Sequence, residues 1–427
     1  MSANPNLKST NGYPIFSFIQ KANNNPVKTL TKNSKRPKIS IIVSDLSSKG
    51  AGRWGGASRP FLLKQALETL GYQVNLVGLA YDHGLPLELP AHSAYISPCA
   101  YYPGGITFLR KIQELLPYLD GDIIYAIKVK LSSFGIGLIR KYLSRRPLIL
   151  DIDDWEMSWH GGDTYRYMNH FKGFVNDLIL PQGSLKHPDH PLYLQYLEKW
   201  INHADRLTVH SQFIQKRFGG VYLPNGKDIE HFNPHHYSPE LSRQNYGLTP
   251  YRLLMFPGAP RPYKGLEDVL MALEILNQPD LRLVIVGGSP YDDYDQQLQA
   301  KWAKWLIILP KLPIEKMPEI VAAAHIIVIP QRDHPAALAQ FPLKLTDGMA
   351  MAKPILSTMV GDIPAILSNT GYLVPPQQPA MIAQQIDWIF NHWSEAEEKG
   401  QMARQRCVEH YSIEAMSKIL ATLITEL

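Results

Sequence analysis

The feature that most constrains the fold of this chain is an alternation of short apolar runs with longer segments of helical period. Residues 39–43 and 74–79 have the character of buried strands, and residues 59–70 between them carry apolar side chains at helical spacing. Further apolar runs follow at 123–126 and 148–150. Strands that alternate with helices predict an α/β fold with a mostly parallel sheet covered on both faces.

The same alternation starts again after a polar, proline-containing stretch at 233–250. Strands are predicted at 253–256, 283–286 and 326–329, and a helix at 266–276. A chain of 427 residues also exceeds what one hydrophobic core usually supports. We therefore predict two doubly wound, Rossmann-like domains facing a central cleft. The predicted parts are a flexible leader at 1–36, a first Rossmann-like domain at 37–240, a second at 241–410, and a C-terminal helix at 411–427 that could pack back on the first domain.

Composition narrows the class of protein. The net charge of +5 is too small to indicate nucleic acid, and no apolar run reaches the roughly 18 residues of a membrane-spanning helix. The two cysteines, Cys99 and Cys407, have no metal-type spacing, and the first residues do not resemble a secretory signal. We expect a cytoplasmic protein that needs no metal or other cofactor.

One basic cluster follows the apolar run at 134–139. It consists of Arg140, Lys141, Arg145 and Arg146. Such a pattern is compatible with docking on anionic lipid at the inner face of a membrane, or on an anionic acceptor. The cluster is explained equally well as the solvated end of a helix, because cations interact favourably with a helix C-terminus.

One glycine-containing loop follows the first strand of each half. The loop at 48–60 contains Gly52, Gly55 and Gly56, which let the backbone approach a ligand, but it lacks the dinucleotide fingerprint. The loop FPGAPRPYKG brings Arg261 and Lys264 to the start of a helix. Two cations beside a helix N-terminus predict a site for a diphosphate.

A later loop in the second half leads into a helix predicted at 342–352. Lys344 and the amides of the first helical turn would face the same anion, and Asp347 could accept hydrogen bonds from ribose hydroxyls. A surface acid on the helix is the alternative for Asp347.

Three aspartates of the first half follow a predicted buried strand in LILDIDDW. Asp151, Asp153 and Asp154 would face the cleft. A single D-x-D pair is a weak metal signal without further hard ligands, so a polar contact to sugar or acceptor is the better interpretation of Asp153. Capping of the following segment is the alternative.

Together these loops resemble the retaining glycosyltransferases of family 4, which have the two-domain GT-B architecture. The resemblance covers about residues 38–426. It is carried by the segments PGAPRPYKG, LPNGKDIEHFNP, ADRLTVHS, LRLVIVGG and FPLKLTDGMAMAKPILSTMVGDIPAIL. It implies transfer of a hexose-type sugar from a nucleotide-diphosphate sugar to a glycan, lipid or small molecule, with retention of configuration.

The resemblance also implies roles for the domains and for single residues. The domain at 37–240 would lie on the acceptor side, and the domain at 241–410 would bind the nucleotide sugar. Arg261 and Lys264 would contact the donor diphosphate, and the loop with Gly55 and Gly56 would face the transferred sugar. With Asp153 from the residues themselves, Arg261 and Lys264 are the catalytic candidates. The donor would be bound by Gly55, Gly56, Gly258, Arg261, Lys264, Phe341, Pro342, Leu343, Lys344 and Asp347.

The chain departs from the family pattern at one position. Relatives commonly carry two glutamates with seven residues between them, whereas this chain has Ala339 and Asp347. The sugar contact of the first glutamate is lost, and Asp333 nearby is a candidate to replace it. A non-catalytic nucleotide-sugar-binding partner subunit and a GT-B nucleotide-sugar epimerase therefore stay open as alternatives.

Overall fold

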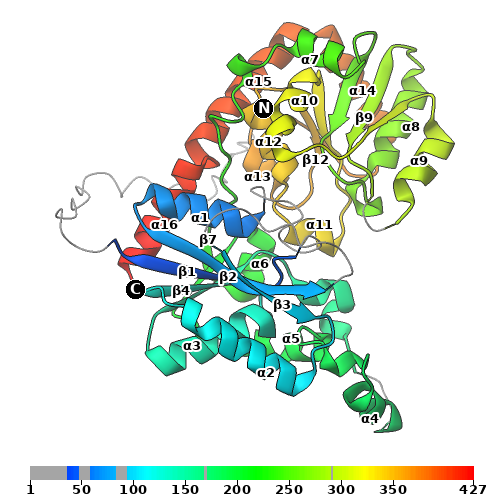
Figure 1. Ribbon diagram of the computed structural model, residues 1–427. Helices are drawn as coiled ribbons and strands as arrows, with labels where there is room; N and C mark the ends of the chain where they lie inside the picture. Colours follow the sequence, from blue (N-terminus) through cyan, green and yellow to red (C-terminus); the bar gives the residue numbers. More distant parts are fainter. Residues whose placement is uncertain (1–35, 48–57, 83–93, 168–170, 290–291) are drawn as a thin grey trace, which may run out of the picture. The chain divides into compact units, whose positions relative to one another are not determined.

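The first half of the protein is built on a seven-stranded parallel sheet. The computed structural model describes residues 36–47, 58–82, 94–167, 171–289 and 292–427 (Figure 1). The strand order is β3-β2-β1-β4-β5-β6-β7. The strands are β1 (Lys38–Val43), β2 (Gln73–Asp82), β3 (Ala94–Ala100), β4 (Ile123–Ile127), β5 (Leu148–Ile152), β6 (Arg206–Val209) and β7 (Val221–Tyr222). The order runs outward in both directions from the boundary of β1 and β4, and such sheets bind ligands beyond the carboxyl ends of the strands there.

Both faces of this sheet are buried, which explains why its strands are apolar throughout. The neighbours Ile41 and Ile42 are both fully buried, but they belong to separate apolar clusters on opposite faces. The α-helices of this half are α1 (Arg59–Thr69), α2 (Gly104–Leu115), α3 (Ile136–Ser144), α4 (Phe171–Ile179), α5 (Pro191–Glu198) and α6 (Gln212–Phe218).

The second half repeats the design with a six-stranded parallel sheet in the order β10-β9-β8-β11-β12-β13. Its strands are β8 (Arg252–Phe256), β9 (Leu281–Val286), β10 (Leu306–Leu309), β11 (Ile326–Ile329), β12 (Ile355–Thr358) and β13 (Tyr372–Val374). Its helices are α7 (Pro239–Asn245), α8 (Leu266–Leu276), α9 (Tyr294–Trp302), α10 (Met317–Ala323), α11 (Pro335–Ala339), α12 (Leu343–Ala350), α13 (Ile363–Leu367), α14 (Pro379–Asn391) and α15 (Trp393–His410). The proposed domain boundary near residue 240 falls between β7 and β8.

The last helix, α16 (Ile413–Thr425), packs on the first half of the chain. Its apolar side chains Met416 and Leu420 share a buried cluster with Leu63 of α1 and Ile39 of β1. The Ser417 hydroxyl also donates to the Ala66 carbonyl oxygen at 2.8 Å. Burial of this amphipathic face ties the end of the chain to α1.

The predicted α/β class with two parallel sheets is confirmed. The helix predicted at 266–276 and the strand predicted at 326–329 coincide with α8 and β11, and the helix predicted at 342–352 is the slightly shorter α12.

The packing of α16 makes a testable prediction. Leu420 is fully buried, so Leu420→Ala should lower the free energy of unfolding by about 2–5 kcal/mol, because it leaves a cavity. Leu427→Ala is the matched control, since Leu427 is 39% exposed. Urea unfolding measures both. Equal, small losses in the two variants would contradict the packing described here.

Candidate active site

The loop that follows β8 carries two of the predicted cations. The Lys264 side chain is buried, and its Nζ donates to Gln340 Oε1 at 3.1 Å. Arg261 forms an ion pair with Asp292 at 3.1 Å. Burial lowers the pKa of Lys264 well below its usual value, and the positive charges of Lys344 and Arg261 lower it further. These three cations are therefore close enough to repel one another.

Lys344 joins this cluster from the first turn of α12. Burial lowers the pKa of Lys344, against the opposing effect of Asp347. Gly258 makes room for this lysine, because a Cβ at that position would lie 2.0 Å from Lys344 Cε. Within the described residues, neither Lys264 nor Lys344 has a carboxylate at ion-pair distance. Two ammonium groups without such a partner, one buried and one half-buried, form a site that a bound anion would stabilise.

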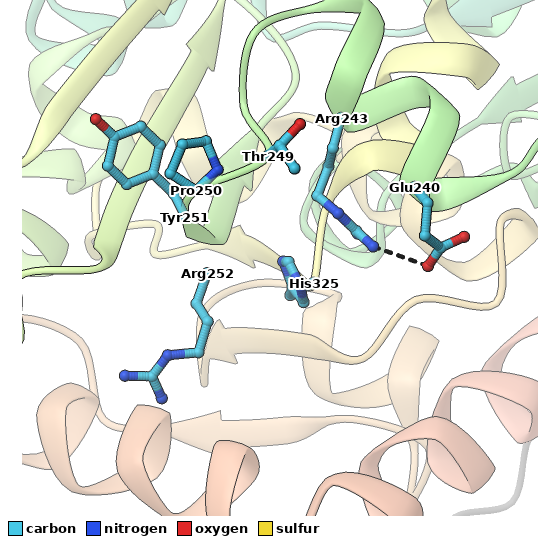
Figure 2. Close-up of a pocket in the computed structure, with 7 residues that line it drawn as sticks. All are labelled: Glu240, Arg243, Thr249, Pro250, Tyr251, Arg252 and His325. Carbon is cyan, nitrogen blue, oxygen red and sulfur yellow. Dashed lines mark hydrogen bonds and ion pairs between the residues drawn. The ribbon is translucent and has the colours of Figure 1, made fainter.

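A pocket elsewhere in the second half contains cations that are paired with carboxylates, in contrast to Lys264 and Lys344. It has a volume of about 350 Å³ and lies at the amino ends of β8 and β11 (Figure 2). Its arginines are neutralised by the protein: Arg243 pairs with Glu240 at 2.9 Å, and Arg252 pairs with Asp280 at 2.6 Å. Its cations therefore do not need an external anion.

Asp347 lies one turn after Lys344 and is buried. Its Oδ1 accepts from Nζ of Lys227, a residue between the two sheets in sequence. The alternative of a surface acid is wrong for this reason. A ribose hydroxyl would have to share the Asp347 carboxylate with Lys227. The ribose contact stays a prediction.

Phe341, Pro342 and Leu343 lead into α12 as the motif predicts. Pro342 occupies the N-cap position of the helix, and Phe341 is buried with its ring 6.3 Å from that of His210. His210 follows β6, so the start of α12 meets the carboxyl end of a strand of the first sheet. Gly55 and Gly56 lie outside the described residues.

The three aspartates after the first-half strand divide into two environments. Asp151 is fully buried within β5, where its two oxygens accept from the Arg59 guanidinium at 3.0 and 2.7 Å. Thr208 also donates to Asp151. The prediction that Asp151 faces the cleft is therefore wrong: this carboxylate joins β5, β6 and α1 inside the fold.

Asp153 and Asp154 belong instead to a buried acid–base group around two lysines. Lys128 Nζ lies 3.6 Å from Asp153 and 3.9 Å from Asp154, and it donates to Glu156 at 2.5 Å. Lys130 lies 3.2 Å from Glu156. Burial raises the pKa of Asp153 to about 6, although Lys128 opposes the shift. The pKa of Glu156 is shifted in the opposite direction. Burial raises it, but the charges of Lys128 and Lys130 lower it to about 2.

Asp154 connects this group to the cations of the second half. Its negative charge raises the pKa of Lys264, against the larger effect of burial. The Oδ1 atoms of Asp153 and Asp154 are buried and accept no hydrogen bond from the described residues. Polar atoms of this kind call for a partner, such as water or a ligand hydroxyl. The sequence did not single out Lys128, Lys130 or Glu156, whose only signal is their position after β4 and β5.

Ala339, at the position of the missing glutamate, ends α11 and is fully buried. Its carbonyl oxygen accepts from the Ser211 hydroxyl at 3.2 Å, and its side chain belongs to the apolar cluster of the first half. Asp333, two residues before α11, is exposed. Ala339 thus offers a methyl group where relatives present a carboxylate.

The basic cluster near α3 is used mostly inside the protein. Arg140 and Arg146 donate to the Leu119 carbonyl oxygen at 2.8 and 3.0 Å. Lys141 donates to Asp205 at 2.8 Å. Arg145 is exposed at the end of the helix.

Neither a metal cluster nor a membrane-spanning helix occurs in the part of the chain that the structure describes. No group of three His, Cys, Asp or Glu side chains there could hold a metal ion. No helix there is both long and apolar enough to cross a membrane.

Comparison with known sequences indicates the class of enzyme. Residues 251–392 match the sequence model described as Glycosyl transferases group 1. A relative named D-rhamnosyltransferase WbpZ, from Pseudomonas aeruginosa, is 29% identical over 67% of this chain and 77% of its own length. The chain is a glycosyltransferase whose residues 251–392 are similar to the group 1 glycosyl transferases. A GDP-mannose-dependent alpha-(1-6)-phosphatidylinositol monomannoside mannosyltransferase of Mycolicibacterium smegmatis is 25% identical over 48% of this chain and 62% of its own length.

Solved structures of distant glycosyltransferases show the same fold. Anabaena Alr3699/HepE in complex with UDP and glucose superposes with a TM-score of 0.66 at 16% identity, over 92% of this chain and 100% of that one. Sucrose-phosphate synthase from Thermosynechococcus elongatus gives a TM-score of 0.65 at 17% identity, over 92% and 99% of the two chains. The predicted GT-B architecture of this glycosyltransferase is confirmed.

The two environments of the aspartates predict opposite effects on stability. Asp151→Asn should lower the free energy of unfolding by about 3–5 kcal/mol at neutral pH, because it leaves Arg59 buried without its anion. Asp153→Asn should leave stability unchanged or raise it. The pKa of Asp153 is higher in the folded state, so its charge costs stability as the pH rises through about 6.

Chemical denaturation at pH 7.5 measures both aspartate variants, each of which replaces one carboxylate with an amide. A loss at Asp153 as large as that at Asp151 would contradict the assignment of Asp151 to the fold and of Asp153 to the site.

Proposed function

We propose that this glycosyltransferase moves a hexose-type sugar from a nucleotide-diphosphate sugar to an acceptor, with retention of configuration. The observation that carries the proposal is the pair of lysines beside Arg261, buried Lys264 and half-buried Lys344, which have no carboxylate partners at ion-pair distance in the described part of the chain. A diphosphate gains negative charge as its bond to the sugar breaks. Fixed cations therefore stabilise the transition state more than the ground state, which accelerates the reaction.

Each candidate residue has a role in this proposal. Lys264, Lys344 and Arg261 hold the diphosphate, and the amides at the start of α12 assist them. Asp347, with Lys227, is the candidate for the ribose. Asp153 makes a polar contact with the sugar or the acceptor. No metal or other cofactor is assigned a role.

The names of the relatives guide the choice of donor and acceptor. One relative is named as GDP-mannose-dependent, so GDP and its sugar conjugates are the first nucleotides to test. Its acceptor is named as a phosphatidylinositol mannoside, and another relative is named as an O-antigen mannosyltransferase. Glycans and lipid-linked sugars are thus the acceptor classes that we propose.

Ala339 favours a second candidate function, a partner subunit that binds the nucleotide sugar without transferring it. A nucleotide-sugar epimerase is a third. Transfer produces a glycosylated acceptor and free nucleotide diphosphate, an epimerase converts the donor without acceptor, and a partner subunit binds without turnover. Nuclear magnetic resonance of the anomeric proton in donor and product separates all three and tests retention directly.

The lysine cluster yields a prediction with two signatures. Lys264→Met should keep or raise the stability of the free protein, because the lowered pKa means that burial of the charged form costs stability. It should also abolish stabilisation by nucleotide, which for the wild type amounts to about 2.7 kcal/mol at 100 times the dissociation constant. In an active preparation, the rate should fall by about 10² to 10³.

Thermal unfolding with GDP, UDP, ADP and TDP and their sugar conjugates measures the first two effects. Lys304→Met is the control, since Lys304 is exposed and its ammonium contacts Asn277 and the Trp305 ring. Undiminished nucleotide binding by Lys264→Met would refute the proposed donor site.

Peripheral membrane contact is a further part of the proposal. Three of the four cations in the basic cluster bond to the protein itself, so the contact would rest on exposed Arg145 with Tyr142 and Leu143 of α3, which are 60% and 68% exposed. Exposed apolar side chains beside a cation suit an anionic lipid surface.

If the end of α3 binds lipid, Leu143→Glu should reduce cosedimentation with vesicles that contain phosphatidylglycerol. Leu241→Glu, on the second half and also exposed, is the control. Equal sedimentation of wild type and Leu143→Glu would remove this contact from the proposal.

A further inference from the structure

An aromatic cluster lies where β2 and β3 end. It consists of Tyr81 near the end of β2, Tyr101 and Tyr102 directly after β3, and His187 from a loop between α4 and α5. The His187 ring lies 4.4 Å from that of Tyr101 and 5.2 Å from that of Tyr81. Tyr81 is buried, whereas Tyr101 and Tyr102 are 40% and 36% exposed. The cluster thus places two partly exposed tyrosine rings beside a buried aromatic ring.

His187 is held in one orientation and one tautomer. Its Nδ1 accepts a hydrogen bond from the amide of Asp189 at 3.1 Å, so in the neutral ring the proton resides on Nε2. The Ser132 hydroxyl donates to Asp189 at 2.7 Å, which fixes the loop to the segment after β4. Burial lowers the pKa of His187, so the ring is neutral at physiological pH.

The Nε2–H group of His187 is the unexplained feature of this cluster. It is buried and has no hydrogen-bond partner among the described residues. A buried donor without an acceptor costs free energy, and such groups in native proteins call for a partner. The cluster therefore combines aromatic ring faces with a hydrogen-bond donor that has no partner.

This cluster is connected to the proposed donor site by a series of charged neighbours. Lys130 acts electrostatically on both Tyr101 and His187. It pairs with Glu156 at 3.2 Å, and Glu156 pairs with Lys128, which reaches Asp153 and Asp154. Asp154 in turn acts on Lys264. Lys130, Glu156, Lys128 and Asp154 thus link the electrostatics of the aromatic cluster to those of the lysine cluster.

We infer that Tyr101, Tyr102 and His187 bind a pyranose ring of the acceptor, so that the acceptor class is a carbohydrate. The inference rests on the proposed function and names the substrate of the same site. A pyranose has an apolar C–H face that packs on aromatic rings and hydroxyl oxygens that accept hydrogen bonds. It can therefore cover Tyr101 and satisfy His187 Nε2 together, whereas an acyl chain would leave the donor without a partner.

The test is binding of simple glycosides. Methyl α-D-mannopyranoside, methyl α-D-glucopyranoside and methyl α-L-rhamnopyranoside are titrated against the full chain with the nucleotide diphosphate that stabilises it. Saturation-transfer nuclear magnetic resonance reports binding. At least one glycoside should bind the wild type. Its affinity should fall about tenfold in Tyr101→Ala and in His187→Ala, which corresponds to about 1.4 kcal/mol of lost contact.

Matched variants separate this effect from changes in folding. Tyr101→Phe keeps the ring and should bind nearly as well as the wild type. Tyr196→Ala removes another exposed tyrosine of the first half, 58% exposed, and should have no effect. Nucleotide-dependent stabilisation is measured in every variant, so that loss of the donor site is recognised separately.

Two results would overturn the inference while leaving the donor proposal intact. One is equal glycoside affinity in wild type, Tyr101→Ala and His187→Ala. The other is nucleotide binding by the wild type without binding of any of the three glycosides, including the case in which short-chain phosphatidylinositol binds instead.

Discussion

The proposed activity depends on buried positive charge that the protein does not neutralise. Lys264 and Lys344 follow parallel strands of the second sheet. Burial lowers the pKa of both, helped by the charge of Lys344 at Lys264 and by that of Lys227 at Lys344. Other cations of the described residues are paired, as Arg59 is with Asp151 and Arg332 is with Asp268, whereas half-buried Lys353 is not, and burial lowers its pKa to about 8. The lysine cluster is set apart because two lysines and an arginine gather there. Such a place is suited to an anionic substrate, whose binding would relieve the repulsion.

The two sheets supply complementary parts of this site. The second half offers cations from the loops after β8 and at the start of α12. The first half offers acids after β5, held by Lys128 and Lys130 after β4. The Lys227–Asp347 pair and the contact of Ser211 with Ala339 join the halves beside the site. The same contacts that connect the halves therefore also border the reacting groups.

The sequence predicted the strands and helices of this structure better than the contacts of its side chains. Apolar runs such as 326–329 specify buried parallel strands directly. The edge strand β3 was not predicted, because Pro98 interrupts its pattern, and proline is tolerated at a sheet edge. Arg261 and Lys264 were found through their loop. Asp151 was misplaced because sequence spacing does not reveal which acid meets Arg59, 92 residues away. Lys128, Lys130 and His187 carry no motif, and only tertiary packing reveals them.

The central claim is that a bound nucleotide diphosphate places its negative charge beside Lys264 and so favours the protonated form of this lysine. Calorimetric titration of GDP or UDP in alkaline buffers of different ionisation enthalpy measures the protons exchanged on binding. Because a bound diphosphate should raise the lowered pKa of Lys264, we predict net proton uptake in the wild type and its loss in Lys264→Met. Nucleotide binding with no proton uptake, or with the same uptake in Lys264→Met, would contradict the account.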